Sequence, residues 1–302
     1  MKGRQANPET GPGGHVPVLL DAVIEALALR DGAAYVDGTF GAGGYSIALL
    51  AAASCRVFAI DRDPDAVRAG AALALHHAGR LAVIEGRFSE MARLLAPLSP
   101  PPIAGVALDL GVSSTQLDTP ERGFSFRLDG PLDMRMGQRG QTAADLVESL
   151  SEPDLAALIG EFGEERFARR VARAIVAARR QRAIRRTLEL AEIVRAAMPK
   201  SEPGLDPATR TFQALRIAVN DELGVLEKGL LGAWSILACG GRIVVVTFHS
   251  IEDRLAKEFF AKKAASGEGR LLMKKPLPPS REEVVTNPRS RSAKLRAIEK
   301  LC

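Results

Sequence analysis

The sequence predicts an α/β fold: a Rossmann-like, doubly wound parallel sheet with an inserted helical domain. Two observations lead to this prediction. Short apolar runs alternate with helical segments up to Asp109, and then about a hundred residues follow without a convincing strand. A last β-branched run, residues 242–248, reads as a buried strand and returns the chain to the sheet.

Four short apolar runs are the expected strands of the first half: 34–37, 56–61, 81–85 and 103–109. Helices are expected between them, over 46–53, 64–76 and 90–95. Ligands of such sheets bind at the carboxyl ends of the strands. Each of these strands ends in a carboxylate, and we expect those of Asp37, Asp61 and Asp109 to line one crevice.

Helix-start signals define the insertion and the return to the sheet. Thr142, Ser151 and Thr187 have side chains that favour N-caps. One long helix is expected from Asp206 to about Leu237, where a glycine pair ends it. These signals predict three parts: a disordered tail over 1–14, a sheet domain made of 15–118 and 206–302, and an inserted helical substrate-recognition domain over 119–205.

Composition excludes several classes of protein. With 302 residues, 46% hydrophobic and 25% charged, the chain is long enough to bury a proper core. It has no apolar run of the ~18 residues that a membrane span needs and no signal peptide, so we expect a cytoplasmic protein. Three widely spaced cysteines and four scattered histidines predict neither a disulfide framework nor a metal site.

A glycine-rich turn follows the first strand and leads into a helix. Such a turn takes positive φ and lets a ligand lie against backbone N–H groups at a helix N-terminus. Asp61 follows about 20 residues later, where a carboxylate accepts ribose hydroxyls. Any α/β protein can use a tight turn of this kind, but the turn and Asp61 together favour a nucleotide-like ligand.

The glycine spacing separates two cofactor classes. A dinucleotide site uses G-x-G-x-x-G, and its third glycine is missing here. The order Asp37, Gly38, Gly41, Gly43 instead resembles the D-x-x-x-G-x-G turn of class I S-adenosylmethionine methyltransferases. S-adenosyl-L-methionine is therefore the expected cofactor.

The loop after the fourth strand holds the candidate catalytic groups. Asp109 is the first candidate, although a carboxylate there can simply cap the loop. Many enzymes that methylate exocyclic amines have a D-P-P-Y type sequence at this place, and this chain lacks it. Further polar candidates are Ser113, Ser114 and Gln116.

Two possible roles remain for each of two aromatic residues and one histidine. Phe124 and Phe126, flanked by arginines, suit either stacking on an extruded base or packing in a core. His249, after the last parallel strand, either orients the substrate or is structural.

Basic residues are concentrated rather than spread. Ten arginines lie between Arg166 and Arg195, with only two glutamates among them. They form either a solvated helix face or a phosphate-binding surface. A second basic stretch, residues 287–296, favours the phosphate-bearing partner.

Long segments of the chain resemble the bacterial small-subunit (16S) rRNA cytosine-N4 methyltransferases, formerly named MraW. The similar segments are 15–20, 37–46, 59–64, 109–117, 122–136, 163–168, 209–214, 247–254, 287–292 and 294–296. The resemblance implies methylation of the N4 amine of one cytidine in the decoding region of 16S rRNA, within the small ribosomal subunit, with S-adenosyl-L-methionine as donor.

The resemblance also implies site residues. Asp109 is the implied catalytic residue, and the implied cofactor contacts are Gly43, Gly44, Tyr45, Asp61, Phe88, Asp109 and Gln116. Two departures stand out: Tyr45 replaces the family's usual histidine, and the region 264–276 is shorter than in other members.

Two other functions fit less well. An RNA-binding ribosome assembly factor that holds the cofactor without turnover would not need an intact glycine turn and both carboxylates. A DNA or small-molecule methyltransferase is disfavoured by the missing D-P-P-Y and the basic insertion. Methylation at C5 of cytosine would need a cysteine in the strand-four or strand-five loop, and none is there.

Overall fold

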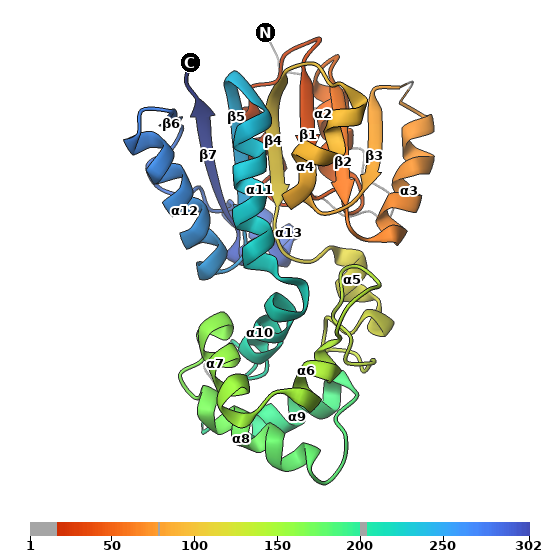
Figure 1. Ribbon diagram of the computed structural model, residues 1–302, viewed down its shortest axis with the longest axis vertical. Coiled ribbons are helices and arrows are strands. Elements are labelled where there is room, and N and C mark those ends of the chain that lie inside the picture. The colour runs from red at the N-terminus through yellow and green to blue at the C-terminus, as the bar shows by residue number, and fades with distance from the viewer. Residues whose placement is uncertain (1–16, 78, 200–203) are drawn as a thin grey trace. The chain divides into compact units, whose positions relative to one another are not determined.

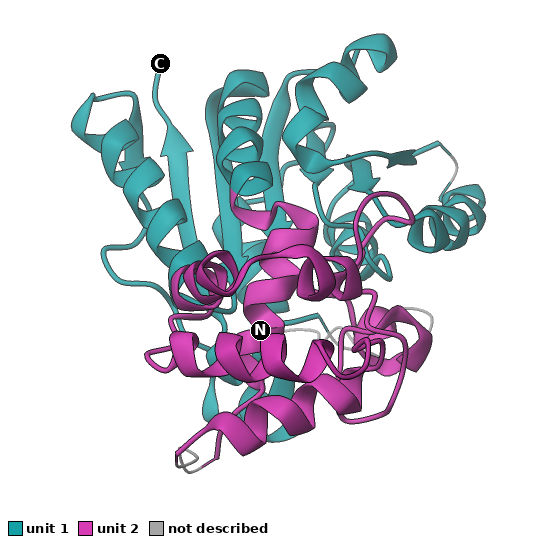
Figure 2. Ribbon diagram, turned by 60° about the horizontal axis from the view of Figure 1, so that its bottom comes forward, with its two compact units in different colours: residues 1–111, 224–302 teal, residues 112–223 magenta. Residues whose placement is uncertain are grey.

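The computed structural model describes residues 17–77, 79–199 and 204–302, and the tail expected at 1–14 lies outside them. The chain forms two compact units, coloured separately in Figure 2. Unit 1 comprises Met1–Gly111 and Gly224–Cys302, and unit 2 comprises Val112–Leu223.

Unit 1 is built on a seven-stranded sheet with the order β3-β2-β1-β4-β5-β7-β6 (Figure 1). Strands β1 to β5 run parallel, and β7 pairs antiparallel with β5 and β6. The strand order reverses between β1 and β4, which is where ligands of doubly wound sheets bind. The bounds are β1 Ala34–Asp37, β2 Arg56–Asp61, β3 Leu81–Glu85, β4 Ile103–Asp109, β5 Leu237–Thr247, β6 Gly269–Leu271 and β7 Lys294–Lys300.

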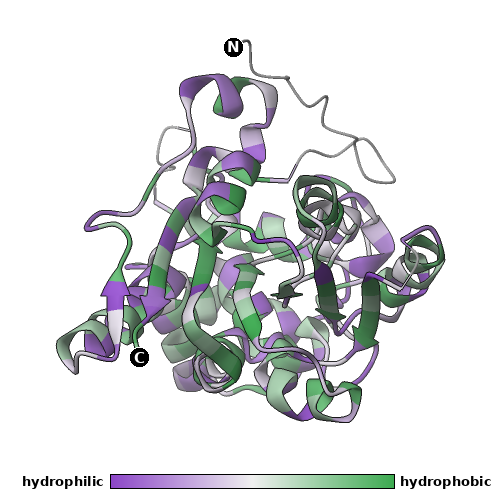
Figure 3. Ribbon diagram, turned by 90° about the horizontal axis from the view of Figure 1, so that it is seen from above, coloured by the Kyte–Doolittle hydropathy of each residue, from purple (hydrophilic) through white to green (hydrophobic). Residues whose placement is uncertain are grey.

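Helices cover both faces of this sheet because the side chains of each buried strand alternate between two apolar clusters. Tyr35 and Val57 face the cluster that includes helices α1 and α2, whereas Val36 and Phe58 face the cluster that includes α4, α11 and α12. Hydrophobic residues accordingly colour the strands in Figure 3. The helices are α1 Leu20–Leu27, α2 Gly44–Ala52, α3 Pro64–Leu75, α4 Met91–Leu95, α11 Glu222–Ile236, α12 Ser250–Ala265 and α13 Arg281–Thr286, with 3-10 turns η1 Phe88–Glu90, η2 Ala96–Leu98 and η4 Pro288–Ser292.

Unit 2 is helical around its own apolar core, in which α8 buries Val171 and Ile175. Its boundaries differ from the expected 119–205, because Phe212 and Leu215 of α10 pack into the same core and Val112 lies against it. The elements are α5 Ser114–Asp118, η3 Pro120–Arg122, α6 Ala143–Ser149, α7 Glu152–Gly163, α8 Ala168–Arg179, α9 Thr187–Ala197 and α10 Thr209–Asn220.

The single long helix expected from Asp206 to Leu237 is wrong. Asp221, at φ 52°, ends α10 in the left-handed region, and α11 begins at the next residue. Aspartate tolerates that conformation better than most side chains, so a helix can end there without glycine. Strand β5 then begins at Leu237, five residues before the expected strand.

Candidate active site

Three carboxylates lie at one edge of the sheet of unit 1, as expected. Asp37, Asp61 and Asp109 are the last residues of β1, β2 and β4, which are parallel neighbours. Two hydrogen bonds hold the edge together: the Asp109 N–H donates to the side-chain Oγ1 of Thr39 at 2.7 Å, and the Gly38 N–H donates to the Ala107 carbonyl at 2.9 Å. Thr39, which the sequence reasoning missed, therefore fixes the place where β4 ends.

The glycine turn joins this edge to α2. Gly41 and Gly43 have φ of 54° and 82°, which favours glycine. A Cβ on Gly43 would come within 2.9 Å of the Phe40 ring, and one on Gly44 within 2.2 Å of Pro17. Both positions therefore have no room for a side chain. The turn keeps the backbone open where α2 begins.

The carboxylate of Asp61 holds the turn. Its Oδ2 accepts the Gly41 N–H at 2.7 Å and its Oδ1 accepts the Asp63 N–H at 2.8 Å. Each carboxylate oxygen can accept a second hydrogen bond, so Asp61 keeps acceptor capacity for a ligand hydroxyl.

Asp37 serves the other side of the turn. It is fully buried, and its Oδ2 accepts the Ser46 hydroxyl at 2.7 Å while Oδ1 accepts the Thr39 N–H at 3.2 Å. Since a helix leaves its first N–H groups without intrahelical acceptors, those of Gly44 and Tyr45 remain available for a ligand. Ser46 was not among the residues expected at the site.

Electrostatics make this edge a site for a cation. Burial raises the pKa of Asp37 to about 6, against an opposing hydrogen bond from Ser46. Burial also raises the pKa of Asp61. The pKa of Asp109 is raised well above its usual range by burial and then by the charges of Asp37 and Glu252. No cationic side chain of the described residues contributes to these three shifts. A positively charged ligand would therefore be stabilised here.

Asp109 has an unsatisfied oxygen. Its Oδ1 is buried without a hydrogen-bond partner among the described residues. Leaving a buried acceptor unpaired costs free energy, and native proteins do so at functional sites. The oxygen is thus a free acceptor at the carboxyl edge of β4.

The model of the MraW methylase family matches residues 13–301. The chain belongs to this family. A relative from Rhodospirillum centenum named ribosomal RNA small subunit methyltransferase H is 56% identical, and the alignment covers 96% of this chain and 93% of the relative. A relative of the same name from Paramagnetospirillum magneticum is 55% identical, covering 95% of each chain. The solved rRNA methylase from Streptococcus thermophilus is 11% identical, covers 93% of each chain and has a TM-score of 0.43.

The residues at this edge fit the cofactor of this methylase family. S-adenosylmethionine bears a sulfonium and an ammonium, so its charge suits three acids with raised pKa values and no cationic neighbour. Its ribose hydroxyls suit Asp61, and the N–H groups at the start of α2 suit its polar groups. Gly43 and Gly44 would hold it through their backbone.

Three of the residues expected to contact the cofactor also make contacts that stabilise the fold. The Tyr45 side chain is buried and its hydroxyl donates to the Val18 carbonyl, so only the backbone of Tyr45 can face a ligand at the turn. The Phe88 ring packs against α11, where a Cβ on Gly229 would come within 2.3 Å of it. Gln116 belongs to unit 2, where it forms a capping box with Ser113 at the start of α5.

His249 is the N-cap of α12. Its Nδ1 accepts the Glu252 N–H at 3.4 Å, and Glu252 accepts the Phe248 N–H at 3.0 Å. Its Nε2 lies 3.0 Å from Glu252 Oε1, but at an angle that makes no hydrogen bond. The structural alternative thus accounts for the contacts of His249. Glu252, which the sequence reasoning missed, raises the pKa of Asp109, and its place three residues after His249 is the capping-box signal.

The two phenylalanines belong to the core of unit 2. Phe124 is 7% exposed, and the Phe126 ring meets Phe212 edge to face at 4.7 Å between centroids. Arg195 covers the Phe126 ring at 5.5 Å. Both rings therefore pack within unit 2, which is the core-packing role of the two expected alternatives.

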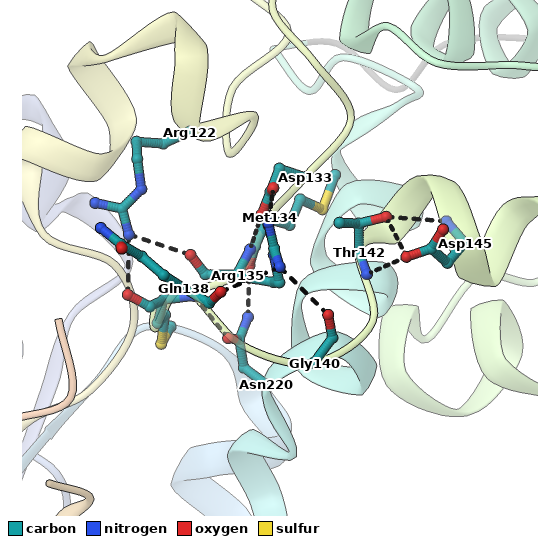
Figure 4. Close-up of polar contacts among 10 residues, drawn as sticks. Arg122, Asp133, Met134, Arg135, Gln138, Gly140, Thr142, Asp145 and Asn220 are labelled. Atoms are coloured by element: carbon teal, nitrogen blue, oxygen red, sulfur yellow. Dashed lines mark hydrogen bonds and ion pairs between the residues drawn. The ribbon is translucent and has the colours of Figure 1, made fainter. Parts of the chain in front are cut away.

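The loop that follows is also fixed (Figure 4). Arg122 donates to the Met136 carbonyl at 2.9 Å, and Asn220 accepts the Met136 N–H at 2.9 Å while donating to the Met134 carbonyl at 2.8 Å. Arg135 pairs with Asp133 at 2.7 Å. The segment is an ordered part of unit 2.

The ten arginines divide into two sets. Five are engaged within unit 2: Arg166 over the Phe167 ring, Arg179 on the Leu150 carbonyl, Arg182 with Glu189, Arg186 with Asp129 and Arg195 with Asp206. Arg169, Arg173 and Arg180 are exposed. Of these, Arg173 makes a solvent-exposed ion pair with Glu152 at 3.4 Å. Arg170 and Arg185, the remaining two, are exposed as well.

The second basic stretch is partly structural as well. Arg296 donates to Asp253 at 2.6 and 3.1 Å, and Lys294 lies 3.5 Å from the same carboxylate, which ties β7 to α12. Arg289 and Arg291 of η4 are exposed.

None of the helices that the structure describes has both the length and the apolar character needed to cross a bilayer.

Proposed function

We propose that this chain methylates the N4 amine of one cytidine in the decoding region of 16S rRNA, with S-adenosyl-L-methionine as donor. The family, the name of the relatives and the acidic edge of unit 1 support this proposal. When bound, the cofactor supplies an electrophilic methyl group on a sulfonium.

The observation that carries the proposal is the free, buried Oδ1 of Asp109. An exocyclic amine must lose a proton when it gains a methyl group, and a carboxylate at the reacting edge can accept that proton. Burial and like charges raise the pKa of Asp109, so its ionised form is a stronger base than an exposed aspartate. We therefore assign Asp109 as the catalytic residue.

The cofactor set follows from the same edge. Asp61 accepts the ribose hydroxyls, and Gly43, Gly44 and the backbone of Tyr45 contact the methionine part. Phe88, which follows β3, closes the adenosine side, and the family resemblance adds Gln116 to the set. The packing of Phe88 on α11 and the capping bonds of Gln116 would hold these two side chains in place.

Unit 2 is the substrate-recognition part in this proposal. Its exposed arginines on α8 neutralise rRNA phosphates, and Arg289 and Arg291 of η4 add positive charge on unit 1. The substrate is 16S rRNA within the small ribosomal subunit, and the reaction takes place in the cytoplasm.

Nucleoside mass spectrometry tests the reaction. Small subunits from cells that lack the protein are incubated with cofactor and either wild type, Asp109→Ala or a control, Asp21→Ala, which changes an exposed carboxylate on α1. We expect N4-methylcytidine with wild type and control, and a loss of most activity, a factor of about 10² or more, with Asp109→Ala.

A chain with all three cysteines changed to serine separates this chemistry from C5 methylation. The N4 reaction needs no covalent adduct, so this variant should keep its activity. A 5-methylcytidine product, an inactive cysteine-free chain or a fully active Asp109→Ala would each refute the proposal.

A further inference from the structure

Two cysteines that are far apart in the sequence come together at the amino edge of the sheet. Cys239 lies in the first part of β5, and Cys302 follows the end of β7. The two strands are antiparallel neighbours, with Arg242 opposite Glu299. Continuing the chain outward from that pair brings the two cysteines toward the same place.

Specific contacts hold this region together. Lys300 Nζ donates to the carbonyls of Trp234 and Leu237 at 2.9 and 2.8 Å, and the Leu301 N–H donates to the Glu268 carbonyl at 2.8 Å. Each cysteine thus lies within two residues of an anchored position.

The bend in β5 exposes one of the thiols. β4 pairs with Leu237 and then only from Arg242, so the residues between form a bulge away from β4, with Gly240 at φ 71°. Both Cys239 and Cys302 are free and exposed. A hydrogen-bonding contact with the Cys239 thiol is the first cause that raises the pKa of Cys302.

We propose that Cys239 and Cys302 are a redox site that closes to a reversible disulfide between β5 and the end of β7. The oxidant is a small-molecule disulfide such as oxidised glutathione. The Cys239 thiolate attacks one of its sulfurs and releases one thiol, and the Cys302 sulfur then attacks Cys239 and releases the second. The two cysteines lose two electrons and two protons, and the small disulfide becomes two thiols.

The third cysteine provides a matched control. Cys55 is buried, and its Sγ contacts the Leu49 carbonyl at 3.4 Å. Because exchange requires access to a thiolate, Cys55 stays reduced in the folded chain. The acids of the candidate active site lie at the opposite, carboxyl edge of the sheet, so closure of the disulfide leaves cofactor binding unchanged.

The experiment incubates the full chain in graded ratios of reduced to oxidised glutathione, then alkylates free thiols and maps the peptides by mass spectrometry. We expect one cross-linked peptide joining Cys239 and Cys302, free Cys55, and a monomer on a non-reducing gel. The disulfide closes a loop of about sixty residues, so Tm should rise by roughly 5 °C on oxidation.

Cys239→Ser and Cys302→Ser should each abolish the cross-link and the shift in Tm, whereas Cys55→Ser should keep both. Independent glutathione adducts on the two cysteines at every ratio, a disulfide-linked dimer, or an unchanged Tm after oxidation would overturn the proposal. Binding of S-adenosylmethionine, measured in both redox states, provides a readout that is separate from the methylation reaction.

Discussion

At the scale of single residues, three aspartates in equivalent strand positions differ because their neighbours differ. Asp61 is held by two backbone N–H groups, Asp37 by the hydroxyl of Ser46 and the N–H of Thr39, and Asp109 keeps an oxygen without a partner in the described structure. The first two therefore shape the glycine turn, and the third keeps a buried acceptor oxygen, which is why we propose Asp109 as the catalytic residue.

Asp61→Ala should weaken the binding of S-adenosylmethionine by ten- to a hundredfold. The loss of hydrogen bonds to neutral hydroxyls costs about 1–3 kcal/mol, which gives that range. Titration calorimetry on both proteins measures it, with Asp65→Ala on the exposed first turn of α3 as control. Unchanged affinity, or tight binding of NAD instead, would contradict the role of Asp61.

Asp37→Asn should change how stability depends on pH. Burial raises the folded-state pKa of Asp37 to about 6, above the usual 3.8, so the folded chain binds the proton more tightly. The free energy of unfolding of wild type therefore falls by about 3 kcal/mol in total as pH rises from 3.8 to about 6. Asparagine does not titrate, so the Asp37→Asn variant does not show this loss.

Urea unfolding of the cofactor-free protein between pH 4 and 7 provides the test. The stability of Asp37→Asn relative to wild type should increase by about 3 kcal/mol across this range. A difference that stays constant with pH would show that Asp37 does not titrate there.

At the scale of elements, helix ends and loops are fixed by side chains from distant segments. Asn220, the last residue of α10, is 1% exposed and bonds to both Met134 and Met136. One buried amide thus satisfies two backbone groups of the loop, a buried carbonyl at Met134 and a partly buried N–H at Met136.

Asn220→Ala should destabilise unit 2 by about 2 kcal/mol, since it leaves buried backbone groups unsatisfied. Thermal or urea unfolding followed by a probe in unit 2 measures the loss. Gln138→Ala, whose side chain is exposed in the same loop, is the control and should have little effect. Equal stability of the two variants would mean that the loop is held by other contacts.

At the scale of the whole molecule, positive charge is local rather than general. Unit 2 contains seventeen Lys and Arg and seventeen Asp and Glu, whereas residues 254–294 of unit 1 contain eleven basic and four acidic residues. In the function we propose, the polyanion therefore binds unit 2 through the exposed face of α8 and not through net charge.

A variant in which Arg169, Arg173 and Arg180 are all changed to glutamine should bind rRNA with a weaker dependence on salt concentration. Each lost contact with single-stranded phosphate removes about 0.7 from the slope of log K against log salt, so three remove about 2. Filter binding at several salt concentrations measures it. The matched control changes Arg30, Arg56 and Arg93, three exposed arginines of unit 1. A wild-type slope in the first variant would place RNA binding on another surface.

The sequence by itself determined the four strands of the first half, whose bounds were all predicted correctly, and the edge that holds Asp37, Asp61 and Asp109. These features depend on local apolar runs and on the last residue of each strand, so they can be read along the chain. Family membership likewise follows from residue order in long segments.

Only the tertiary structure decided the features that depend on distant partners. The sequence reasoning missed β6, which is short, and β7, which is rich in charge. They are defined by pairing, of β7 with β5 and of β6 with β7, rather than by composition. The Tyr45 side chain turns to Val18, the arginines divide into engaged and exposed sets, and Cys239 meets Cys302. Each outcome is set by side-chain contacts in the folded chain, several of them between segments far apart in the sequence, which no local pattern records.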